Sequence, residues 1–182
     1  MTQEIPATTN AAKPRKGTGR ITLLLFVALI GFEVWKTVRF GTPKKIEVTE
    51  LHLRDLRGVP IASETFAGKA VLLNYWAPWC GPCKLEIPWL AELQREHPND
   101  LVIVGIVDDP QDYQGALAYM QAKGATYPLA QLSPETHAAL GEMHTVPTTF
   151  YLSRSGHVLH AINGVVPQSV LKHWVKDAIA AK

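Results

Sequence analysis

The only two cysteines of this 182-residue chain, Cys80 and Cys83, are separated by two residues. An apolar run over residues 71–76 leads into the pair, and a run with helical spacing over 84–96 follows it. A strand that ends in Cys-x-x-Cys and opens a helix is typical of a redox-active dithiol. The spacing therefore predicts thiol–disulfide exchange, in which a thiolate attacks a disulfide sulfur.

The expected helix start gives the two sulfurs different roles. Free backbone N–H groups and the helix dipole favour negative charge at a helix N-terminus, which lowers the pKa of a thiol there. Gly81 and Pro82 suit the first turn, because proline loses no hydrogen bond at that position and has a preset φ. We therefore expect Cys80 to be the exposed nucleophile. Cys83, one turn further along and more buried, is expected to resolve the mixed disulfide.

Three other interpretations of the cysteine pair stay open at this point. A closed zinc site needs four ligands, and the chain has no second cysteine pair to complete one. A purely structural disulfide is disfavoured by the Trp-x-Gly-Pro pattern at its mouth. A Cu(I)-binding module would use the soft thiolates of Cys80 and Cys83, together with His144. The other histidines are scattered, and we expect neither a resident metal nor a cofactor.

Residues 79–83, Trp-Cys-Gly-Pro-Cys, match the active-site pattern of thioredoxins. The wider stretch 68–80, together with 84–88 and 145–150, resembles the membrane-anchored TlpA/ResA/DsbE (CcmG) branch of that superfamily. The resemblance covers residues from about 45 to the end of the chain. It implies an α/β thioredoxin fold, a central mixed sheet flanked by helices. It also implies an N-terminal β-hairpin, a helix–strand insertion and an N-terminal transmembrane helix.

The same resemblance implies a substrate groove beside the cysteines. It implies a cis bond between Val146 and Pro147 that faces Cys80, and the Val146 backbone would pair with a substrate chain as an additional strand. Thr145 stands where the family usually has glycine, so the width of the groove is expected to differ. His144 is a further residue for the edge of the groove, with a plain surface position as the alternative. The expected substrate-binding residues are Trp79, Gly81, Pro82, Thr145, Val146 and Pro147.

Glu86 is the third residue expected to take part in the chemistry. Thioredoxin has a buried Asp where this chain has Asn74, and the anchored branch instead uses an acid at the position of Glu86. This glutamate lies three residues after Cys83, one helical turn away, so it faces the same side of the helix. We expect it to accept and return the proton of the resolving thiol. The alternative is an exposed glutamate in the first turn, favoured there by the helix dipole.

The remaining pattern predicts the elements that position these residues. A hairpin is expected over 46–66, and central strands over 70–76 and 101–107. The helix that begins at Gly81 should bury Leu85, Trp89, Leu90 and Leu93 and should kink at Pro88. The inserted helix and strand are expected over 113–123 and 127–130. Further elements are expected in chain order as a helix over 134–140, strands over 148–152 and 157–162, and a helix from 167 to 181.

The sequence pattern of the N-terminal region predicts a membrane anchor. Basic residues precede the apolar run 21–32, which is short for a span of ~20 residues unless it extends to 40 with snorkelling basic side chains. A cleaved signal peptide and a buried helix of a soluble protein are the alternatives, but bulky residues follow the apolar run where a cleavage site needs small ones. The expected division is a disordered cytoplasmic tail over 1–19, a single transmembrane anchor over 20–40, a linker over 41–45, and a thioredoxin-like domain over 46–182.

Composition and resemblance together predict the function. A net charge of +2 gives no reason to expect nucleic-acid binding. Basic residues near the two ends of the anchor are balanced, so the resemblance decides the orientation: a bacterial inner-membrane protein with its redox domain in the periplasm. We expect a protein-disulfide reductase, acting on apocytochrome c or copper-handling thiol proteins and re-reduced by a membrane donor such as a DsbD-like reductase. The alternative within this chemistry is an oxidase that donates its disulfide.

Overall fold

The computed structural model describes residues 45–109, 111–141, 143 and 145–181. The expected tail over 1–19, the anchor over 20–40 and nearly all of the linker lie outside these residues. Across the part of the chain that is described, none of the helices combines the length and the apolar character that a membrane span requires.

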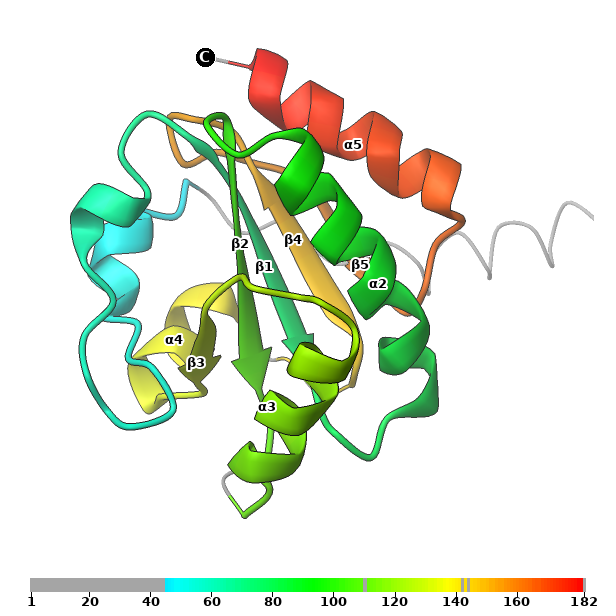
Figure 1. Ribbon diagram of the computed structural model, residues 1–182. Helices are drawn as coiled ribbons and strands as arrows, with labels where there is room; N and C mark the ends of the chain where they lie inside the picture. The colour runs from blue at the N-terminus through cyan, green and yellow to red at the C-terminus, as the bar shows by residue number, and fades with distance from the viewer. Residues whose placement is uncertain (1–44, 110, 142, 144, 182) are drawn as a thin grey trace, which may run out of the picture. The chain divides into compact units, whose positions relative to one another are not determined.

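A five-stranded mixed sheet with the strand order β3-β2-β1-β4-β5 forms the centre of the fold (Figure 1). The central pair, β1 (Ala70–Trp76) and β2 (Leu101–Val107), is parallel, and β3 (Leu129–Gln131) runs parallel to β2. On the other side, β4 (Thr148–Leu152) is antiparallel to β1, and β5 (Val158–Asn163) is antiparallel to β4. The mixed sheet expected from the sequence is therefore confirmed.

Helices cover both faces of this sheet, which explains why β1 and β2 are buried at every position and apolar throughout except at Asn74. On one face, α2 (Gly81–Glu96), α3 (Tyr113–Ala122) and α5 (Gln168–Ala180) pack over a core that includes Leu72 and Ile103. The opposite face packs under α4 (Pro134–Leu140) and the N-terminal segment, as Figure 1 also shows. The redox helix α2 thus lies over the centre of the sheet.

The hairpin expected over 46–66 is reduced to one antiparallel bridge between Arg54 and Pro60. The flanking residues form short 3-10 helices instead, η1 (Val48–Leu51) and η2 (Ser63–Thr65). Two local causes prevent longer strands: His52 has a left-handed backbone with φ 47°, and Pro60 has no N–H to donate to a ladder. The turn itself is closed by Asp55, whose carboxylate accepts hydrogen bonds from the backbone N–H groups of residues 57 and 59.

The helix α2 buries a different set of residues from the one expected. Leu90 and Leu93 are buried as predicted, and Trp89 is half-buried, but Leu85 is 61% exposed. The face toward the sheet is instead occupied by residues at spacings of three and four, namely Cys83, Glu86, Ile87, Leu90 and Leu93. Leu85 is two residues from both Cys83 and Ile87, which places it about 200° around the helix from each. Its predicted burial is therefore wrong.

The other elements lie where the sequence predicts them, within one or two residues. The helix α4 begins after Ser133, whose side chain accepts a hydrogen bond from the Thr136 N–H, as expected of a capping serine. The largest shift is in β3, which begins at Leu129 instead of at Tyr127. Pro128 has no N–H for a ladder, although its carbonyl accepts a hydrogen bond from the Gly105 N–H at 3.0 Å.

Candidate active site

The two cysteines lie at the junction between β1 and α2. Cys80 is the N-cap of α2, with an extended backbone at φ −77° and ψ 106°, and proline occupies the first turn as predicted. The Cys80 sulfur accepts a hydrogen bond from the Cys83 backbone N–H at 3.1 Å. An N–H group of the helix start thus points at the sulfur predicted to become the thiolate, which is the arrangement that lowers a thiol pKa.

Cys80 and Cys83 form a disulfide, with their Cα atoms 5.3 Å apart. Both side chains are buried in this oxidised state, Cys80 with 4% and Cys83 with 1% of its surface exposed. The expectation of an exposed Cys80 is therefore wrong for the oxidised pair, in which the Cys80 sulfur is bonded to the buried Cys83 and hydrogen-bonded to its backbone N–H. The order of the two exposures agrees with the prediction, but the assignment of nucleophile and resolving thiol remains a prediction.

The loop that leads into β4 carries the second part of the site. The bond between Val146 and Pro147 is cis, as the family resemblance implied. The first residue of β4, Thr148, pairs with Tyr75 near the carboxyl end of β1, so this loop lies at the same end of the sheet as the cysteines. Val146 is half-buried and packs against the core cluster that contains both cysteines, while Thr145 is exposed. His144 lies outside the described residues.

Two exposed large apolar side chains lie close to the cysteines in the sequence. Trp79, immediately before Cys80, is 67% exposed, and Leu85 is 61% exposed on the outer side of α2. Gly81 and Pro82 are exposed between the two cysteines. Large apolar side chains in water are characteristic of interaction surfaces when they gather near one site. The sequence analysis assigned Trp79 to substrate binding, which agrees with an exposed side chain. It assigned Leu85 to the core, and only the structure shows that Leu85 is exposed.

Glu86 is buried beneath α2, with 1% of its surface exposed. Burial raises the pKa of its carboxyl group to about 7, and the backbone N–H of Val166 offsets this shift in part without forming a hydrogen bond of ordinary geometry. Neither carboxyl oxygen has a hydrogen-bond partner among the described residues. The alternative of an exposed glutamate in the first turn is therefore excluded. A carboxyl group with a pKa near neutrality is well suited to exchange protons with a thiol.

Comparison with known proteins identifies the family. The family model described as Redoxin matches residues 43–178. This chain belongs to the Redoxin family. Among curated relatives, the thiol-disulfide oxidoreductase ResA of Bacillus subtilis is 24% identical over 156 residues, covering 84% of this chain and 87% of that protein. The sporulation thiol-disulfide oxidoreductase A of the same organism is 30% identical over 165 residues, covering 85% of this chain and 96% of that protein.

A solved structure supports the fold of this redoxin. The crystal structure of a putative thiol:disulfide interchange protein DsbE from Chlorobium tepidum superposes with a TM-score of 0.64. It covers 78% of this chain and 100% of that chain, at 23% sequence identity. The thioredoxin fold and the resemblance to the ResA and DsbE branch, both stated from sequence motifs, are thereby confirmed. In this redoxin no group of three or more His, Cys, Asp or Glu side chains suited to a metal ion occurs among the described residues.

The helix α2 of this redoxin continues through Pro88, which cannot donate a hydrogen bond to the carbonyl of Lys84. The hydroxyl of Tyr119, on α3, donates to that carbonyl at 3.0 Å. The Lys84 ammonium also lies 5.3 Å from the centre of the Tyr119 ring, over its face. Sequence reasoning missed Tyr119. The available signal was Pro88, because a proline inside a helix leaves the carbonyl four residues earlier, that of Lys84, without its backbone donor. The sequence does not indicate which residue replaces that donor.

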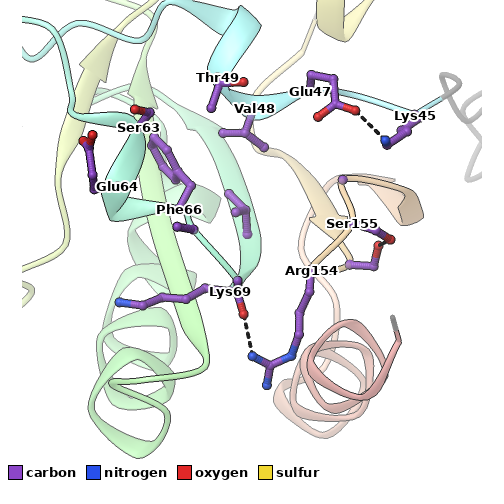
Figure 2. A pocket seen from close by; sticks show the side chains of 15 residues that line it. Lys45, Glu47, Val48, Thr49, Ser63, Glu64, Phe66, Lys69, Arg154 and Ser155 are labelled. Atoms are coloured by element: carbon purple, nitrogen blue, oxygen red, sulfur yellow. Dashed lines mark hydrogen bonds and ion pairs between the residues drawn. The ribbon is translucent and has the colours of Figure 1, made fainter.

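A hollow of about 590 Å³ lies away from the redox site, at the opposite end of β1. Its walls include Lys69 and Val71 at the start of β1 and residues 153–156 between β4 and β5. Figure 2 shows Lys45 and Glu47 along one rim of this hollow, across from Arg154. Cys80 follows the other end of the seven-residue strand, about 20 Å away at 3.3 Å per residue. This hollow therefore does not belong to the redox site.

Proposed function

We propose that this chain is a thiol:disulfide oxidoreductase that reduces disulfides in protein substrates through Cys80 and Cys83. The observation that carries the proposal is the disulfide at the start of α2, whose Cys80 sulfur accepts a hydrogen bond from the helix N-terminus. The names of the curated relatives, which are thiol-disulfide oxidoreductases, support the same chemistry.

In the reduced protein the Cys80 thiolate attacks one sulfur of the substrate disulfide. That disulfide breaks, its other sulfur leaves as a thiolate that takes up a proton, and Cys80 is joined to the substrate. Cys83 gives its proton to Glu86, and the resulting thiolate attacks the Cys80 sulfur. The second substrate thiolate leaves and is protonated. Two electrons have passed to the substrate, and the protein holds the Cys80–Cys83 disulfide.

Substrate binding uses the loop before β4 and the exposed apolar side chains near the disulfide. The backbone of Val146 pairs with an extended segment of the substrate, and the side chains of Trp79 and Leu85 contact apolar residues that flank the substrate cysteine. Their exposures of 67% and 61% support this role, since neither side chain contributes to the core.

A disulfide formed in each turnover requires a reductant, and we assign this role to a membrane dithiol donor such as a DsbD-like reductase. The proposed anchor over 21–40 holds the redox domain on the periplasmic side of a bacterial inner membrane, near that donor. The substrates that we assign to this reductase are proteins of cytochrome c maturation or copper-handling thiol proteins. The Gly81-Pro82 dipeptide, which reducing thioredoxins share, supports the direction of electron flow.

The test combines activity and redox equilibrium of the full chain. The reduced protein is expected to reduce insulin disulfides, and the activity should be lost in both Cys80→Ser and Cys83→Ser. Equilibration with glutathione should give a potential well below that of the periplasmic oxidant DsbA, about −120 mV. A potential near that of DsbA, with the pair mostly oxidised in cells, would instead assign the chain as a disulfide-donating oxidase.

A further inference from the structure

The face of the sheet beneath α2 carries polar side chains at its centre, although the surrounding positions are apolar. Asn74 of β1 is aligned with Gly105 of β2 on one side and with Thr149 of β4 on the other. The Asn74 side-chain amide donates to the Thr149 hydroxyl at 2.9 Å. Trp76 and Tyr151 each lie two residues further along their strands, so they project from the same face.

Gly105 brings two further polar side chains together on this face. A Cβ atom at this glycine would lie 3.0 Å from Trp76 Nε1 and 3.4 Å from Cε2 of Tyr127, the residue that approaches from just before β3. Leu129 Cδ2 would be nearer still, at 2.6 Å, so the missing side chain leaves room in which the Leu129 side chain, the indole N–H and the Tyr127 ring approach one another.

Four residues on this side of the sheet have buried polar atoms without a hydrogen-bond partner among the described residues. These atoms are Trp76 Nε1, the Tyr127 and Tyr151 hydroxyls, and both carboxyl oxygens of Glu86. Trp76, Tyr127 and Tyr151 belong to the core cluster that packs under α2, the helix that carries Glu86. Buried polar groups in proteins are almost always satisfied, either by protein groups or by internal water. Here the indole and hydroxyl donors match the acceptors of the carboxyl group.

We propose that Trp76, Tyr127, Tyr151 and Glu86 line a buried water site beneath α2, in which the two tyrosine hydroxyls and the indole N–H orient water that hydrogen-bonds to the Glu86 carboxyl group. The inference rests on the proposed function in one respect, because the water supplies a path for the proton that Glu86 exchanges with Cys83. Tyr127 and Tyr151 are then positioning residues, which act on the chemistry through Glu86.

The charges around Glu86 agree with this arrangement. Burial raises the pKa of Tyr127 and of Tyr151, and the negative charge of Glu86 raises both further, so both hydroxyls keep their protons at neutral pH. The other titratable group near Glu86 on its own helix is Cys83. On β5, His160 packs edge-on against the Tyr151 ring at 6.2 Å and is paired with Asp177. No Lys, Arg or His among the described residues contributes to the shifted pKa of Glu86.

The test follows the titration of the Glu86 carboxyl carbon by NMR in the oxidised full chain, in which the cysteines do not titrate. A carboxylate that loses hydrogen bonds has a higher pKa. Tyr127→Phe and Tyr151→Phe should each raise the Glu86 pKa by about one pH unit, because water that the hydroxyl no longer orients costs the carboxylate about one hydrogen bond. The matched control is Tyr75→Phe, a buried tyrosine whose side chain packs into the core on the opposite face of the sheet. It should leave this titration unchanged.

A second measurement separates a water site from hydroxyls that simply lack partners. Removing a hydroxyl that binds water should lower the Tm, whereas removing an unpartnered buried hydroxyl should raise it. Water-to-protein NOEs to the Tyr127 and Tyr151 rings should identify long-lived water directly. An unchanged Glu86 titration in both variants, or a raised Tm in both, overturns the proposal. Absence of insulin reduction by the unmodified chain would count against the proposed function only, because neither the Glu86 titration nor the water NOEs depend on turnover.

Discussion

The hydroxyl of Tyr119 donates a hydrogen bond of 3.0 Å to the backbone carbonyl of Lys84, the residue that follows Cys83. No backbone N–H of the helix donates to that carbonyl, because Pro88, four residues on, has no N–H. Tyr119 belongs to α3, so a second helix completes the backbone hydrogen bonding of the redox helix. The first turns of α2, up to Pro88, are thereby connected to a second element of the fold.

Tyr119→Phe should weaken this connection while keeping the ring and its packing. Loss of one hydrogen bond, with a carbonyl left unpaired, should lower the free energy of unfolding by about 1 kcal/mol. Amide exchange in the first two turns of α2 should become faster. Urea denaturation and hydrogen exchange measure the two effects. Tyr113→Phe, at the start of the same helix, is the control. Equal exchange rates in α2 for both variants would show that the Tyr119 hydroxyl does not hold the helix.

Glu86→Gln should change how stability depends on pH. Because the carboxyl pKa is about 7 in the folded protein and lower when unfolded, the folded state binds the proton more tightly. Stability should therefore fall as pH rises through the range from about 4.5 to 7, with a total loss on the order of 3 kcal/mol. The amide does not titrate, so Glu86→Gln should remove this slope and slow the resolution of mixed disulfides.

Urea unfolding of the oxidised protein at several values between pH 5 and pH 8 measures this slope. Glu64→Gln, at an exposed position, serves as the control and should retain the wild-type dependence. A slope that persists unchanged in Glu86→Gln would mean that another group titrates in this range, and Glu86 would lose its assigned role.

The two cysteines should differ in reactivity once the disulfide is reduced. The helix N–H that points at the Cys80 sulfur favours its thiolate, whereas Cys83 lies deeper, so Cys80 should be alkylated at least tenfold faster near neutral pH. Mass spectrometry of the adducts measures the ratio. Cys83→Ser should trap mixed disulfides with substrate proteins, and Cys80→Ser should trap none. Faster labelling of Cys83 would reverse the two roles.

Trp79→Ala and Leu85→Ser should impair substrate binding with little effect on folding. Both side chains are mostly exposed, so the free energy of unfolding should change by no more than about 0.5 kcal/mol. The KM for a protein disulfide should rise several-fold, while the reaction with a small disulfide such as oxidised glutathione should be unaffected. Leu117→Ser, at an exposed position on α3, is the matched control. Equal KM values for all three variants would remove these side chains from the proposed docking surface.

The local chemistry of this protein could be predicted from its sequence. The strand over 70–76, the cysteine pair at the start of a helix and the proline in its first turn all follow from residues close together in the chain. The cis bond before Pro147 was implied by the family motif and is confirmed. Each of these features depends on short-range geometry or on a pattern that extends over a few residues, and both can be read without knowledge of packing.

The tertiary structure decided the features that depend on contacts between distant segments. Leu85 is exposed and Glu86 is buried because the rotation of α2 about its axis is set by its packing on the sheet, which residue spacing alone leaves open by one position. The donor for the Lys84 carbonyl comes from 35 residues away. The buried polar atoms that lack partners among the described residues likewise come from α2, β1, β4 and the segment before β3. Such partners are chosen by the alignment of strands and the stacking of helices, because only the folded chain brings these residues within contact distance.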